Sequence, residues 1–101
     1  MLAETARMIA QRHDILERLR ALLIEEIDVR REGFEIDPDA PLFGTGIALD
    51  SVDGIELAVG IETVFGVTLP EGDEVAAVTR SLNTIVDFVV ATRAPQDAEA
   101  P

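Results

Sequence analysis

The sequence of 101 residues contains no cysteine, which excludes a disulfide, a thiolate metal site and a thiol nucleophile. Any thiol that the protein uses would therefore have to come from a group outside its own side chains. Lysine is also missing, so all eight basic residues are arginines, and 20 acidic residues give a formal net charge of −12. Nucleic-acid binding needs a basic footprint, so we expect no nucleic-acid partner. A partner with a cationic surface is the natural counterpart.

Long apolar runs are absent as well. No run approaches the roughly 18 residues that a membrane span needs, and Glu4, Arg7 and Arg12 lie where a signal peptide would be apolar. We therefore expect a cytoplasmic protein without a membrane span. The hydrophobic fraction of 48% is typical of a globular chain, and the length suffices for one domain with one core. We expect that domain to be a monomer.

Apolar residues recur at spacings of three, four and seven over residues 4–29, which predicts a long first helix. The helix is long for a domain of this size, so we expect its first two turns to project. The predicted apolar stripe consists of Met8, Ile9, Ile15, Leu16, Leu19, Leu22, Leu23 and Ile27.

Glycine and proline punctuate residues 30–50, which predicts a long loop. Its expected anchors in the core are Phe34, Ile36, Leu42, Phe43, Ile47 and Leu49. The acids of this loop do not form a calcium site, because Leu42 replaces the required glycine and Ala48 replaces the bidentate glutamate. We expect no metal site.

A second helix is predicted from Ser51 to Phe65, where Gly66 is a suitable left-handed cap. Either Asp50 or Ser51 can cap its N-terminus. At 100° per residue, one face forms the expected core stripe of Gly54, Leu57, Ala58, Ile61, Val64 and Phe65.

The opposite face of this helix is also apolar. Val52, Ile55 and Val59 line up near Ser51, and Glu56, Glu62 and Thr63 flank them. Apolar side chains rimmed by carboxylates favour a docking strip for an apolar and basic partner surface. A helix buried nearly all round is the alternative.

The remaining elements complete an all-α fold. Residues 67–70 are an extended connector, residues 71–78 a short acidic helix, and Ser81 caps a last helix. Three main helices and one short helix, with a long loop between the first two main helices, predict a four-helix bundle. We expect the domain to span residues 1–93 and residues 94–101 to be a disordered tail. The expected buried stripe of the last helix is Leu82, Ile85, Val86, Val89 and Val90.

The chain is poorly equipped for catalysis, and we expect no catalytic residue. Leu49 and Asp53 stand where a nucleophile elbow around Ser51 would need glycine, and the only histidine, His13, is remote in the sequence. An exposed serine at a helix N-terminus is, however, a suitable place for a phosphodiester, because amide donors and the helix dipole favour an anion.

Residues 50–57, with the sequence Asp-Ser-Val-Asp-Gly-Ile-Glu-Leu, closely resemble the Asp-Ser-Leu-acid-x-aliphatic-Glu-Leu signature of acyl carrier proteins. Residues 61–67 resemble the family's aliphatic-Glu-x-x-Phe-Gly-aliphatic segment. The resemblance covers about residues 14–91 and implies that Ser51 bears a covalent 4′-phosphopantetheine arm. The thiol of that arm would hold an acyl group as a thioester, so the protein would act as a non-catalytic carrier.

The resemblance also implies partners and further sites. A phosphopantetheinyl transferase would load the arm, and acyl ligases, ketosynthases or acyltransferases with basic docking surfaces would use it. Residues that match the family's recognition helix are Asp50, Val52, Asp53, Glu56, Val59 and Glu62, and Ile55 joins them from the outward strip. Leu57, Ile61 and Leu69 match positions around the pocket that shelters an acyl chain.

Three departures from the family pattern suggest a specialised carrier for a dedicated lipid, polyketide or polyene pathway, rather than the housekeeping carrier. The segment between Phe43 and Asp50 is one residue longer, Thr63 and Val64 stand where many members are acidic, and the first helix begins early. Two alternatives stay open. One is an aminoacyl or peptidyl carrier, and the other is an unmodified adaptor that binds through the outward strip.

Overall fold

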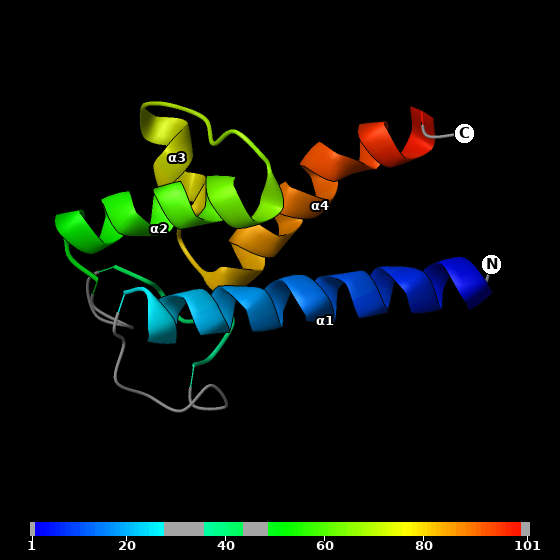
Figure 1. The fold of residues 1–101 in the computed structure, drawn as a ribbon, viewed down its shortest axis with the longest axis horizontal. Coiled ribbons are helices and arrows are strands. Elements are labelled where there is room, and N and C mark those ends of the chain that lie inside the picture. The colour runs from blue at the N-terminus through cyan, green and yellow to red at the C-terminus, as the bar shows by residue number, and fades with distance from the viewer. Residues whose placement is uncertain (1, 28–35, 44–48, 100–101) are drawn as a thin grey trace.

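The computed structural model describes residues 2–27, 36–43 and 49–99. Its four helices are α1 (Leu2–Glu25), α2 (Ser51–Phe65), α3 (Asp73–Val78) and α4 (Leu82–Glu99), and these residues contain no strand. The all-α prediction of three main helices and one short helix is confirmed. In Figure 1, α1 runs along the lower side of the molecule, while α2 and α3 lie across from it.

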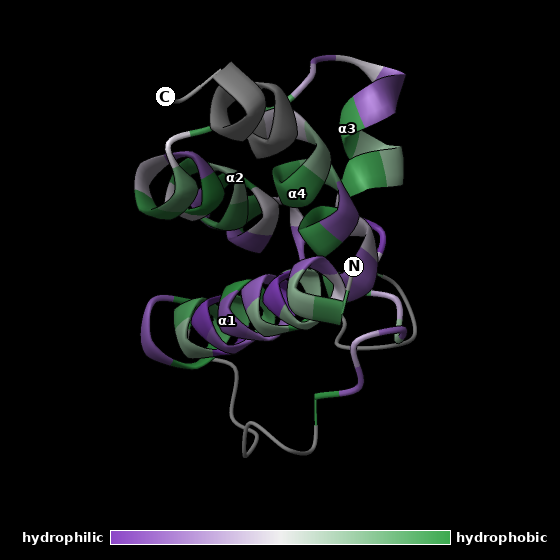
Figure 2. Cartoon of the chain, turned by 90° about the vertical axis from the view of Figure 1, so that its right-hand side faces the viewer, coloured by the Kyte–Doolittle hydropathy of each residue, from purple (hydrophilic) through white to green (hydrophobic). Residues whose placement is uncertain are grey.

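One side of α1 enters the core. Ile15, Leu19, Leu22 and Leu23 are buried there, at the spacings of a single helical face. Green and purple segments accordingly alternate along α1 in Figure 2. The helix ends four residues before the predicted boundary, at Glu25, and Ile27 is buried just beyond it.

The first turns of α1 lie outside the packed region. Residues 2–10 are all exposed, and the helix extends past α2 in Figure 1. Met8 and Ile9 continue the predicted apolar stripe but are 55% and 64% exposed, so the buried part of the stripe begins only at Ile15. An ion pair of 2.8 Å between Arg12 and Asp87 connects α1 to α4 just after these turns.

The core is built from α1, α2, α4 and the segments that connect them. It includes three predicted loop anchors, Ile36, Leu42 and Leu49, together with Val67 and Leu69 of the connector. Phe34 and Ile47 lie outside the described residues, and the prediction of Phe43 as a core anchor is wrong, because this side chain is 36% exposed. On α4 the buried residues are Leu82, Ile85, Val86 and Val89, whereas Val90 is only half-buried.

The loop before α2 is tied to the rest of the bundle by backbone groups. The Leu42 N–H donates to the Arg80 carbonyl at 2.9 Å, and the Asn83 N–H donates to the Pro38 carbonyl at 2.9 Å. Arg20 of α1 donates from Nη2 to the Ile36 carbonyl at 3.1 Å. The loop therefore docks on both α1 and the start of α4.

The last helix begins as predicted and ends later than predicted. The Ser81 N–H donates to Thr84 Oγ1 at 3.0 Å, and the Thr84 N–H donates back to Ser81 Oγ at 3.2 Å. The helix continues to Glu99, through residues predicted to be a disordered tail. Alanine, glutamine and glutamate in this stretch are good helix formers, although Pro95 removes one backbone donor. A domain boundary at residue 93 stays a prediction.

Candidate functional site

Ser51 is the first residue of α2, and its side chain is exposed. Asp50 is the N-cap: its carboxylate accepts from the Asp53 N–H at 2.8 Å, and the Asp53 carboxylate accepts from the Asp50 N–H at 3.1 Å. This capping box fixes the helix start on both sides of Ser51. The Ser51 hydroxyl makes no hydrogen bond to any described residue, so it is available to an enzyme.

The chain before Ser51 is anchored in the core. Leu49 is buried, and its N–H donates to the Leu42 carbonyl at 2.8 Å. The Phe43 ring lies against α2 at Gly54, where an added Cβ would come within 3.2 Å of the ring. Leu49 and Phe43 therefore hold the approach to Ser51 at a set position on the bundle, which leaves the serine at its surface.

The outward face of α2 is exposed, as the docking hypothesis requires. Val52, Ile55 and Val59 are 61%, 66% and 58% exposed. The alternative of a helix buried nearly all round is therefore wrong. Glu56 and Glu62 are also exposed, and Asp53 is half-buried in the capping box.

The exposed side chain of Glu62 also makes a structural contact. Its carboxylate accepts a hydrogen bond from the Leu69 N–H at 2.9 Å. Gly66 ends α2 in the left-handed conformation, with φ of 67°, and donates its N–H to the Glu62 carbonyl. Glu62 thus helps to hold the connector that brings Val67 and Leu69 into the core.

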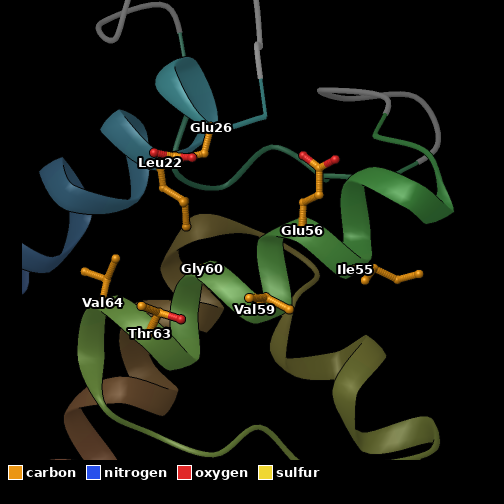
Figure 3. Close-up of a pocket in the computed structure, with 8 residues that line it drawn as sticks. All are labelled: Leu22, Glu26, Ile55, Glu56, Val59, Gly60, Thr63 and Val64. Carbon is orange, nitrogen blue, oxygen red and sulfur yellow. The ribbon is translucent and has the colours of Figure 1, made fainter.

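A groove of about 500 Å³ opens beside the outward face, between α2 and the end of α1 (Figure 3). We call it the α1–α2 groove. Leu22 points from α1 toward Gly60, while Ile55, Val59 and Thr63 project from α2. Its lining residues are Leu22, Glu26, Ile55, Glu56, Val59, Gly60, Thr63 and Val64.

Half of the residues that line this groove are not predicted by the sequence pattern. Val64 was expected in the core, but it is 43% exposed, because the buried face of α2 is narrower than the predicted stripe and consists of Leu57, Ile61 and Phe65. Leu22 and Glu26 come from another helix, so only the tertiary structure adds them. The one signal available was Gly60, since glycine within a helix can mark a close approach.

The chain matches the phosphopantetheine attachment site family over residues 17–89. This chain belongs to the acyl carrier protein family. An acyl carrier protein of Thermosynechococcus vestitus (strain NIES-2133 / IAM M-273 / BP-1) is 32% identical over 76 residues, which cover 75% of this chain and 88% of that protein. No solved structure matches the chain. The cofactor of this family is covalently attached 4′-phosphopantetheine.

The residues at the start of α2 fit such a group. The Ser51 hydroxyl is exposed, and the first amides of the helix favour a phosphodiester, whereas the Asp50 and Asp53 carboxylates oppose the added charge. Both carboxylates accept hydrogen bonds from backbone N–H groups within the capping box, and these bonds partly offset their negative charge. An arm attached to Ser51 would begin at the surface, away from the packed core.

The expected acyl-chain residues of the carrier lie in its core. Leu57 and Ile61 are fully buried, and Leu69 is 7% exposed. All three belong to the same hydrophobic cluster as the buried residues of α1 and α4. An acyl chain could enter between them only if core side chains moved.

Other classes of site lack support in the described residues. His13 is exposed on α1, and no hydrogen bond or ion pair joins its side chain to a nucleophile or an orienting group among the described residues. Among the residues that the structure describes, no three histidine or acidic side chains gather to hold a metal ion. In the same residues, no helix is both long and apolar enough to cross a membrane.

Proposed function

We propose that Ser51 is the attachment site and that the protein carries acyl groups as thioesters on its 4′-phosphopantetheine arm. The observation that carries this proposal is an exposed, unbonded hydroxyl held by a capping box at the start of α2. The chain has no cysteine, so the arm supplies the thiol on which an acyl group is held. The chain's own residues position the arm and bind the enzymes that act on it.

The enzymes that meet this carrier are, in this proposal, a phosphopantetheinyl transferase and acyl ligases, ketosynthases or acyltransferases of a fatty-acid, polyketide or related lipid pathway. The exposed acids and aliphatic residues of α2 support a basic and apolar docking surface on these enzymes. The residues proposed to meet them are Asp50, Val52, Asp53, Ile55, Glu56, Val59 and Glu62. Leu57, Ile61 and Leu69 are proposed to line the acyl shelter.

The test is incubation with coenzyme A and a broad-specificity phosphopantetheinyl transferase. The intact mass of the protein should rise by one phosphopantetheine group, and Ser51→Ala should abolish the gain. A missing gain, or one that survives the substitution, would defeat the assignment. Offering the loaded protein to fatty acyl ligases and amino-acid ligases in parallel separates an acyl carrier from an aminoacyl carrier.

An adaptor function is the second candidate, because the exposed strip of Val52, Ile55 and Val59 needs no arm in order to bind a protein. Under this alternative, Ser51→Ala would leave every partner interaction and the cellular activity unchanged. Under the carrier proposal, the same substitution removes the activity even where docking persists.

A further inference from the structure

At one point of the α1–α2 groove, a side chain of α1 lies directly against the backbone of α2. A Cβ added to Gly60 would lie 2.6 Å from Leu22 Cδ1 and 2.8 Å from its Cδ2. Glycine at this position therefore lets the Leu22 side chain rest directly on the backbone of α2. Leu22 is itself buried and forms an apolar floor next to Gly60 (Figure 3).

The walls of the groove are apolar and open to solvent. Ile55, Val59 and Val64 are 66%, 58% and 43% exposed, and no described segment of the chain covers them. Exposed aliphatic residues around a buried floor form a surface that gains free energy when another apolar group excludes its water.

Two carboxylates give the groove its charge. Glu26, just after α1, and Glu56, on α2, both line it, and no basic side chain of the described residues does. Neither carboxylate makes an ion pair or hydrogen bond with any residue in the described parts of the chain. Arg18 lines a smaller adjoining groove and pairs with Asp14 at 3.1 Å.

We propose that the α1–α2 groove receives an amphipathic helix of a partner enzyme, with one large apolar side chain inserted beside Leu22 and basic side chains that meet Glu26 and Glu56. This inference rests on the proposed carrier function for the identity of the partner. It extends the docking surface from α2 to the end of α1, with Leu22, Glu26, Gly60 and Val64 as determinants.

Charge decides between possible occupants. A nucleic acid would be repelled by both carboxylates, and a second copy of this chain would bring a formal charge of −12 against the same sign. A partner helix with flanking arginine or lysine has the complementary charge. Ile55 follows Ser51 by four residues, or about 6 Å along the helix, so a partner bound here would sit beside the base of the arm.

The experiment is a titration of the full-length ¹⁵N-labelled protein, followed by NMR, with a synthetic peptide of about 16 residues, a length that allows a helix. The peptide carries a central phenylalanine and an arginine four residues to either side. We expect amide shifts centred on Leu22, Glu26, Gly60 and Val64. Shifts confined to other surfaces would overturn the proposal, as would an absence of shifts.

Matched variants make the test specific. Glu26→Lys should weaken binding at least about five-fold at low salt, whereas Glu71→Lys, an equal charge change on an exposed residue outside the groove, should change it less than about two-fold. Val64→Ser should weaken binding and Ile9→Ser should not, since Ile9 is exposed away from the groove. Equal effects in the two members of either pair would overturn the proposal.

The Ser51→Ala protein separates this inference from the carrier proposal. It should bind the peptide normally, because Ser51 does not line the groove. A failed loading reaction with normal peptide binding would defeat the carrier proposal alone, and normal loading without peptide binding would defeat the groove proposal alone. A doubled mass of the free protein, lost in Glu26→Lys and Val64→Ser, would assign the groove to a second copy and overturn the partner helix.

Discussion

Leu22 of α1 occupies the space that a side chain at position 60 of α2 would need, because a Cβ there would meet three of its carbon atoms at 2.6, 2.8 and 3.2 Å. A change of the Leu22 χ2 angle would move Cδ1 and Cδ2 but would leave Cγ at 3.2 Å. Glycine at position 60 therefore leaves free the space that the Leu22 side chain fills beside the groove.

Gly60→Ala should therefore destabilise the protein, although alanine is the better helix former by about 1 kcal/mol. Overpacking against buried Leu22 costs about 1–3 kcal/mol, so the free energy of unfolding should fall by about 1 kcal/mol overall. Urea denaturation measures the change. In a Leu22→Ala background the clash is gone, and Gly60→Ala should then be neutral or stabilising. The same loss in both backgrounds would contradict the close contact.

Asp50→Ala should lower the free energy of unfolding by about 1 kcal/mol, because the N-cap of α2 loses its side-chain acceptor. Asp50→Asn is the matched control, since asparagine caps equally well and removes only the charge. Thermal denaturation of the two variants should separate capping from charge. Equal destabilisation by both substitutions would show that the charge, and not the hydrogen bond, is what matters.

Glu62→Ala should release the connector after α2, since the Leu69 N–H loses its acceptor. We expect a loss of about 1 kcal/mol and faster hydrogen exchange at the Leu69 amide. Glu62→Gln keeps an oxygen acceptor and should preserve most of the protection. Glu56→Ala removes an exposed carboxylate without such a contact, and protection of Leu69 should be unchanged in it.

Added salt should raise the melting temperature. A net charge of −12 on a chain of 101 residues produces self-repulsion, and ions at about 0.1 M screen exposed charges beyond about 10 Å. Magnesium at equal ionic strength should raise it at least as much. A melting temperature that is flat or falls between low and moderate salt would contradict this prediction.

The elements near Ser51 followed from local sequence, and the groove did not. Asp50, Gly66 and the spacing of Leu57, Ile61 and Phe65 give α2 its bounds and its buried face, because caps and periodicity are local properties. The exposure of Val64 depends on how α1 crosses α2. Its position on the helix wheel is compatible with either environment, so only the packing of the two helices decides it.

The two ends of the chain show the same limit. Met8 continues the apolar period of α1, yet the core has ended before it, and periodicity does not reveal where a neighbouring helix stops. At the other end, α4 runs through Pro95 to Glu99 because helix propensity persists after the buried stripe has ended. The local sequence pattern predicts where the helices lie. The extent of the core depends on how those helices pack against one another, which the local pattern does not contain.

The central claim is that Ser51 carries the arm, and fragmentation mass spectrometry of the transferase-treated protein tests it most directly. The account predicts one phosphopantetheine group per chain, located at Ser51, on fragments that contain this residue and on no others. An unmodified chain, or a group located at any other hydroxyl, would contradict it.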